Sequence, residues 1–140
     1  NTSEARKYFQ RNMEINDVVN RDAQFIGNIH LGQIYLLQDN NLVDSEILLS
    51  NAMELNLAEI KNGSLDRSFP FNIAGVYAIR GNPNEAIRWL DKAIDINWVD
   101  YYMLTHGPWF ISMRKHPELL KRIDLLKSKM KKLREQSSSL

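Results

Sequence analysis

Histidines and carboxylates are the side chains of this sequence that could carry catalysis or hold a metal ion. The three histidines are His30, His106 and His116, and no two of them have the His-Glu-x-x-His spacing typical of a zinc site. The absence of cysteine excludes a thiolate nucleophile and a cysteine-ligated metal. The sequence also contains no glycine-rich phosphate loop and no Gly-x-Ser-x-Gly nucleophile elbow. We therefore expect this chain not to be an enzyme and to bind no cofactor, metal or small-molecule substrate.

A basic segment near the C-terminus could bind anions. Between residues 114 and 135, nine lysines and arginines outnumber three acidic residues, whereas the rest of the chain is acidic and the whole carries only +1. Such a segment could bind nucleic acid or an anionic lipid surface, although we favour a solvated helix face that carries lysines. The candidate contacts are Lys121, Arg122, Lys127, Lys129, Lys131, Lys132 and Arg134. No aromatic residue lies among them, which disfavours single-stranded targets.

An internal repeat predicts the elements that would position these residues. Residues 5–16, 45–56 and 86–97 resemble one another, with periods of 40 and 41 residues. Periods of this length are typical of stacked helical pairs rather than of a single globular core. We therefore predict an all-α protein, an α-solenoid of antiparallel helix pairs with a C-terminal capping helix.

Apolar spacing and terminal residues place the helices along the chain. The first carries an apolar stripe of Ala5, Phe9, Met13 and Val18. The next is capped by Asp22 and ends at the polar run 38–41, and another starts at Asp44 and ends at Gly63, where glycine can adopt a left-handed conformation. The remaining predicted helices cover about residues 71–80, a stretch opened by Pro83 or Asn84, and a stretch after Pro117.

Residues 72–97 resemble a tetratricopeptide repeat, and the likeness extends in weaker form over most of residues 1–97. The family's small, large, tyrosine and glycine positions in this unit are Ala74, Tyr77, Gly81, Ala86, Leu90 and Ala93. In the preceding unit they are Gly32, Tyr35, Ser45, Leu49 and Ala52. The resemblance implies about two and a half repeats in residues 1–97, whose small residues allow two helices to approach closely.

Residues 98–140 differ from the repeats and are expected to form an aromatic capping segment, a basic helix and a frayed serine-rich end. Residues 98–120, with the motif Arg114-Lys-His-Pro-Glu-Leu119, resemble the segment that follows the last repeat in many bacterial signalling proteins. Some nucleotide cyclases, protein kinases and winged-helix regulators end in this way. The resemblance implies a C-terminal fragment of such a protein, cytoplasmic or, for a membrane-anchored parent, periplasmic.

The family resemblance also implies a concave groove lined by the first helix of each pair. The corresponding residues are Ile29, His30, Gln33, Leu36, Phe71, Asn72, Gly75 and Ile79. Ile29 and Phe71 stand where a lysine would be needed to hold a peptide carboxylate, so we predict a peptide or partner helix held by apolar anchors. The alternative, which stays open, is that the closing segment folds back and fills this groove.

The apolar residues Leu126, Met130 and Leu133 follow Pro117 at helical spacing. They could cap the last repeat, or they could form an assembly surface for a dimer or coiled coil. The leading function is therefore a protein-interaction or regulatory scaffold that binds a protein or peptide partner, with a homodimer possible. Binding of nucleic acid or an anionic membrane surface is the less favoured alternative.

Overall fold

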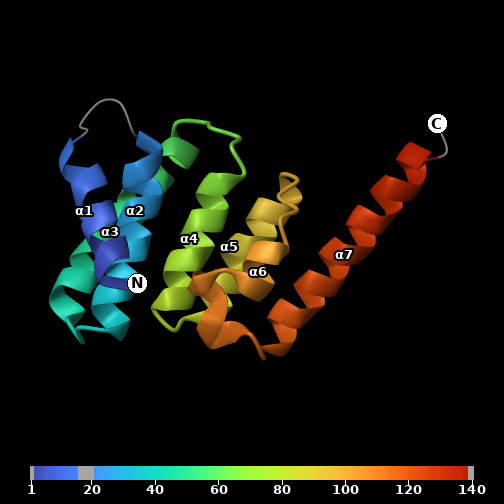
Figure 1. Cartoon of the computed structure of the whole chain (residues 1–140). Coiled ribbons are helices and arrows are strands. Elements are labelled where there is room, and N and C mark those ends of the chain that lie inside the picture. Colours follow the sequence, from blue (N-terminus) through green and yellow to red (C-terminus); the bar gives the residue numbers. More distant parts are fainter. Residues whose placement is uncertain (1, 16–20, 139–140) are drawn as a thin grey trace.

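The computed structural model describes residues 2–15 and 21–138 and is all-α over these ranges, with no strand. This confirms the predicted fold class at the level of helix content. The helices are α1 (Thr2–Ile15), α2 (Arg21–Leu37), α3 (Leu42–Lys61), α4 (Ser68–Ile79), α5 (Pro83–Asp95), α6 (Tyr102–His106), the 3₁₀ helix η1 (Pro108–Met113) and α7 (Pro117–Ser138). Figure 1 shows α1 to α5 side by side, while α7 rises away from them. The predicted stripe residue Val18 and the side chains of Phe9, Met13 and Asp22 lie outside the described part of the chain.

The helix ends follow local side-chain chemistry. Asn41 caps α3 by accepting a hydrogen bond from the Asp44 amide at 3.2 Å, so α3 begins two residues before the predicted start at Asp44. Asn82 caps α5 in the same way, and Pro83 occupies its first turn as predicted. After α3, Gly63 has a φ of +89°, the left-handed conformation expected from the sequence.

Helix α4 starts earlier than the sequence predicts, at Ser68 instead of about residue 71. The Asp66 carboxylate accepts hydrogen bonds from the Ser68 amide and the Ser68 hydroxyl, at 2.9 and 2.7 Å. These bonds lower the pKa of Asp66, because they stabilise its charged form. The bonds between Asp66 and Ser68 therefore extend the start of α4 beyond its apolar pattern.

The consecutive helices pack through their small residues. A Cβ on Gly32 of α2 would lie 2.8 Å from the Leu49 side chain of α3, and the Ser45 hydroxyl donates to the Gly32 carbonyl at 2.7 Å. Ala74 of α4 and Ala86 of α5 are fully buried. The small side chains let these helices approach closely, so that the larger apolar residues fill a continuous core.

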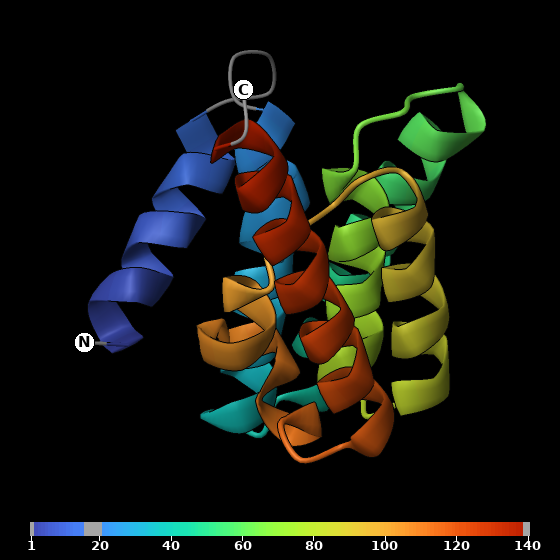
Figure 2. The same ribbon diagram turned by 90° about the vertical axis from the view of Figure 1, so that its right-hand side faces the viewer.

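The C-terminal elements return to this body after α5. Helix η1 packs on α4, and the first half of α7 is anchored to α5 by Arg122, which forms two 2.9 Å bonds with the Asp91 carboxylate. Figure 2, seen from the side on which α7 lies, shows α6, η1 and α7 following one another. The Arg122 to Asp91 bonds join residues 31 positions apart, and a bond from Gln33 to Pro108 joins residues 75 positions apart. The closing segment therefore lies against helices from much earlier in the chain.

Candidate functional site

The residues predicted to line a concave groove are brought together by α2 and α4. Ile29 is fully buried, Phe71 is 6% exposed and Asn72 is 3% exposed, whereas His30 is only partly buried. Asn72 turns toward α3, where its side-chain amide donates to Asn56 Oδ1 at 3.0 Å. The residues predicted to line the groove therefore lie on two neighbouring helices, and most of them are not accessible to solvent.

The aromatic residues of the closing segment cover this groove. Phe71 stacks on Trp98 with ring centroids 4.3 Å apart, and on Trp109 and Phe110 at 5.7 and 5.8 Å. A Cβ on Gly75 would lie 2.4 Å from Trp109 Cε3, so only glycine admits the indole at this position. Trp109 and Phe110 are themselves 5% and 1% exposed.

Two hydrogen bonds fix the closing segment in the groove. The Trp109 indole N–H donates to His30 Nδ1 at 3.3 Å, and the Gln33 amide donates to the Pro108 carbonyl at 2.7 Å. Burial lowers the pKa of His30, because desolvation disfavours the imidazolium, and the neutral ring keeps Nδ1 available as an acceptor. Of the two arrangements that the sequence left open, the structure therefore has the closing segment inside the groove.

The two remaining groove residues lie at its edge. Ile79 is partly buried against the core. Leu36 is also partly buried and lines a separate hollow of about 660 Å³, where α2, α3 and α4 meet. The full lining of this hollow, which we call the α3 hollow, is Leu36, Leu42, Val43, Ser45, Glu46, Ile47, Leu49 and Arg80.

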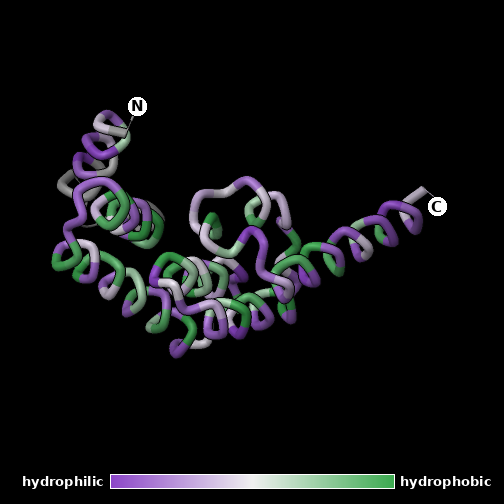
Figure 3. The backbone as a smooth tube through the Cα atoms, turned by 90° about the horizontal axis from the view of Figure 1, so that it is seen from below, coloured by the Kyte–Doolittle hydropathy of each residue, from purple (hydrophilic) through white to green (hydrophobic). Residues whose placement is uncertain are grey.

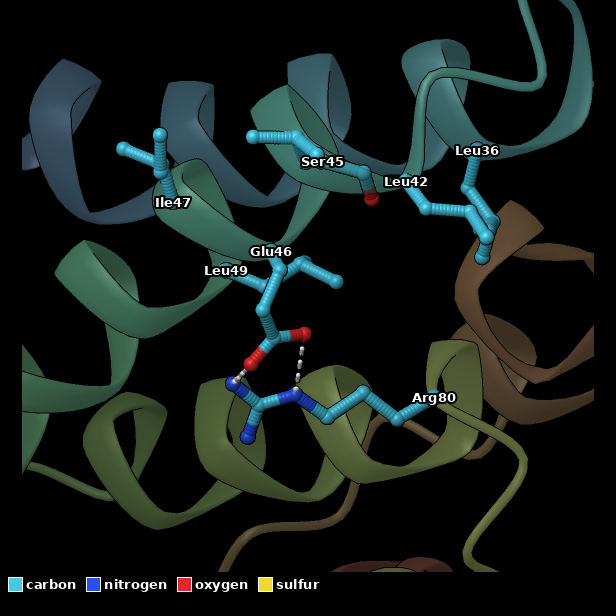
Figure 4. A pocket seen from close by; sticks show the side chains of 8 residues that line it. Leu36, Leu42, Ser45, Glu46, Ile47, Leu49 and Arg80 are labelled. Atoms are coloured by element: carbon cyan, nitrogen blue, oxygen red, sulfur yellow. Dashed lines mark hydrogen bonds and ion pairs between the residues drawn. The ribbon is translucent and has the colours of Figure 1, made fainter.

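The α3 hollow exposes apolar side chains around one ion pair. Leu42, Val43 and Ile47 are 60%, 71% and 53% exposed. The Arg80 guanidinium forms an ion pair with the Glu46 carboxylate at 2.5 Å, and Figure 4 shows the two groups facing each other. The arrangement offers an apolar surface for a partner's side chains and a charged pair for its polar groups.

Sequence reasoning missed the α3 hollow as a site. The repeat assigns Ser45, Leu49 and Ala52 to the packing face of α3, and all three are buried. Leu42, Val43 and Ile47 fall outside those positions, on the solvent side. The signal that could have identified this surface is a group of apolar residues on α3 that do not occupy repeat positions.

The predicted assembly residues on α7 have three different environments. Leu126 is fully buried in the core of its own chain, Met130 is half-buried and Leu133 is 46% exposed. Leu126 therefore packs within its own chain, and a dimer or coiled-coil contact could use only the last two. Figure 3 shows the second half of α7 extending beyond the other helices.

Ion pairs hold the buried half of α7 in place. Glu118 pairs with Lys121 at 3.0 Å and with Arg122, which also binds Asp91. The bonds from Lys121 and Arg122 lower the pKa of Glu118, and the bonds from Asp91 and Glu118 raise the pKa of Arg122. Lys121 and Arg122, two of the basic residues predicted to contact an anion, are thus engaged in ion pairs within the chain.

The part of the chain that the structure describes contains no cluster of side chains suited to a metal ion. No group of three or more histidine, aspartate and glutamate side chains there could hold a metal ion. His30 contacts Trp109, and His106 stacks on Tyr102 with centroids 4.2 Å apart. Within the same ranges, no helix is both long enough and apolar enough to cross a bilayer.

Comparisons with known proteins identify no relative of this chain. No family model, no curated protein and no solved structure matches this chain.

Proposed function

We propose that this chain is a protein-interaction module built from tetratricopeptide-like helix pairs, stacked as an α-solenoid and closed by its C-terminal segment. The support is that the family's small and large positions do the packing that the resemblance implies. Gly32 admits Leu49, and Ala86, Leu90 and Ala93 are fully buried on α5. Stacked pairs of this kind need their last apolar face covered, which is the role of Trp109 and Phe110.

The partner in this proposal is a peptide or helix with apolar anchors, docked in the α3 hollow. The observation that supports it is the exposure of Leu42, Val43 and Ile47, which line a hollow of about 660 Å³ that is open to solvent. Contiguous exposed apolar groups on a water-facing helix are typical of interaction sites. The concave groove predicted from the sequence is filled by the closing segment, so docking there would require that segment to leave.

The experiment is a selection of displayed peptides on the immobilised chain, followed by measurement of each peptide's affinity for variants. Val43→Glu and Ile47→Glu place a charge in the α3 hollow without disturbing the core. Leu65→Glu is the matched control, because Leu65 is 82% exposed and lies in the loop after α3. The proposal expects selected peptides to lose affinity for the first two variants only. Peptides that bind all three variants equally would contradict it.

The parent protein in this proposal is a bacterial signalling or transcription-regulatory protein. It rests on the resemblance of residues 98–120 to the closing segments of such proteins, and on the packing of that segment as a cap. A cytoplasmic location follows from that parent, or a periplasmic one if the parent is membrane-anchored.

Nucleic-acid or anionic-lipid binding is the second candidate, favoured by the exposure of the basic residues along the end of α7. Lys127, Lys131, Lys132 and Arg134 are all exposed there. Binding of duplex DNA or anionic vesicles would weaken steeply with salt, because each neutralised phosphate releases counterions. Titration of both probes at two salt concentrations tests this candidate, and the absence of binding at low salt would reject it.

A further inference from the structure

The second half of α7 presents an apolar stripe that the other described elements cover only in part. Leu119, Ile123 and Leu126 are 0%, 5% and 0% exposed, and they pack on the body. Met130 is half-buried and Leu133 is 46% exposed, and the described residues after Met130 are all exposed. Figures 1 and 3 show why, since α7 leaves the body along its length.

The stripe is continuous across the two halves. The intervals from Leu119 through Ile123, Leu126 and Met130 to Leu133 are four, three, four and three residues. This is the alternation of a and d positions in a heptad, with Met130 at an a position and Leu133 at a d position. The surface that packs on the body therefore continues, in the same register, into the part that projects.

Basic residues flank the projecting part of the stripe. In this register the e and g positions beside Met130 and Leu133 are Lys127, Lys129, Arg134 and the neutral Gln136. Residues at e and g face the neighbouring helix and determine which partner it accepts. A second copy of α7 would bring like charges together on both sides of the seam, which disfavours self-pairing and selects an acidic partner.

A hollow beside Met130 extends this surface onto the body. It measures about 430 Å³ and is lined by Val99, Asp100, Tyr101, Tyr102, Met130 and Arg134. Tyr102 is 61% exposed, and Lys127 Nζ lies 5.9 Å from the Tyr101 ring centroid. A helix laid along the end of α7 would therefore contact tyrosine on one side and lysine on the other. Asp100 is the one acidic group of this lining, so the partner would place a neutral or basic residue against it.

We propose that the projecting half of α7 binds an acidic amphipathic helix of another protein. Its apolar residues cover Met130 and Leu133, and its carboxylates lie beside Lys127, Lys129 and Arg134. A nucleic acid is the poorer fit, because phosphates use the lysines but leave the apolar stripe uncovered. This surface lies on α7, separate from the α3 hollow, so the inference stands or falls independently of the docking site proposed above.

The test uses a labelled synthetic helix of about three heptads, with leucine at a and d and glutamate at e and g, titrated with the full chain. A second peptide carries lysine at e and g. The acidic peptide is expected to bind the chain at least about tenfold more tightly than the basic one. Equal affinities would overturn the proposal.

Two matched pairs of variants locate the contact. Leu133→Glu should lower the affinity for the acidic peptide by about tenfold or more. Leu125→Glu is the matched control, because Leu125 is similarly exposed at 55%. It should leave the affinity unchanged, since Leu125 lies off the stripe. The double variant Lys127→Glu, Arg134→Glu should also lose binding, and Lys131→Glu, Lys132→Glu should lose less for the same change in net charge. Equal losses of affinity within either pair would show that the peptide is attracted by charge in general and not bound at the stripe, which would overturn the proposal.

Two other occupants are distinguished in the same experiments. A dimer in light scattering that Leu133→Glu dissociates would assign the stripe to a second copy and contradict the charge argument. Binding of a DNA duplex of about 20 base pairs that Leu133→Glu leaves unchanged, with no binding of the acidic peptide, would assign the surface to nucleic acid. Either result would overturn the proposal.

Discussion

The groove between α2 and α4 and the α3 hollow are both apolar, but only the groove is covered by the chain itself. Phe71 in the groove is 6% exposed beneath stacked aromatic rings, whereas Val43 at the hollow is 71% exposed. The difference lies in the closing segment, whose Trp98, Trp109 and Phe110 stack on Phe71 of α4. Apolar character alone therefore does not identify a docking site, and the path of the closing segment does.

The largest expected effect is from a charge in the covered groove. Phe71→Glu should destabilise the fold by about 3–5 kcal/mol, because the carboxylate would be buried without a partner beneath three aromatic rings. Urea unfolding followed by circular dichroism measures this. Leu65→Glu, at an 82% exposed position, is the control and should stay within about 0.5 kcal/mol of the parent. A small effect for Phe71→Glu would mean that the groove is open to solvent.

The next largest effect on stability is expected at Gly75, against which the Trp109 indole packs. Gly75→Ala should cost about 1–3 kcal/mol, since the added methyl would lie 2.4 Å from Trp109 Cε3. The free energy of unfolding should be measured for Gly75→Ala in the parent and in a Trp109→Leu background. A cost that is the same in both backgrounds would show that the clash is not with the indole.

A pH dependence of stability is also expected from the groove. Burial lowers the pKa of His30, so the folded state binds fewer protons than the unfolded one below the ordinary value of 6.5. The stability that the neutral ring provides is complete above that value and is lost as the pH falls toward the lowered pKa. Unfolding free energies at about pH 8 and pH 5.5 should therefore differ more for the parent than for His30→Gln. Identical differences would show that burial of His30 does not lower its pKa.

The smallest expected effect on stability comes from the α3 hollow. Val43→Glu and Ile47→Glu should change the free energy of unfolding by no more than about 0.5 kcal/mol, because both side chains are more than half exposed. Thermal unfolding of the two variants checks this. A loss comparable with that of Phe71→Glu would show that another part of the chain covers the hollow.

Local patterns in the sequence predicted much of the fold. The helix content, the cap glycine Gly63, the opening proline Pro83 and the buried alanines all follow from spacing and neighbours within one turn. Asn41 was not identified as the cap of α3, because the aspartate three residues later is an equally good capping residue. Errors of this kind are confined to one helical turn.

Long-range contacts could not be predicted in the same way. The indole that fills the groove lies 79 positions after His30, and nothing local to His30 or Gly75 specifies it. The projection of α7 beyond Leu126 also has no local signal, since the stripe continues unchanged to Leu133. Both features depend on where separate helices meet, and this decides which of the candidate surfaces is free.

The measurement that tests the covered groove most directly is a nuclear Overhauser spectrum of the labelled chain. The account predicts strong cross-peaks between the Trp109 ring protons and the Gly75 α-protons, because a Cβ at Gly75 would lie 2.4 Å from Trp109 Cε3. It also predicts that the Trp109 indole N–H exchanges slowly with solvent, since it is buried and donates to His30. Missing cross-peaks together with fast exchange would contradict the account and return the groove to the candidate docking sites.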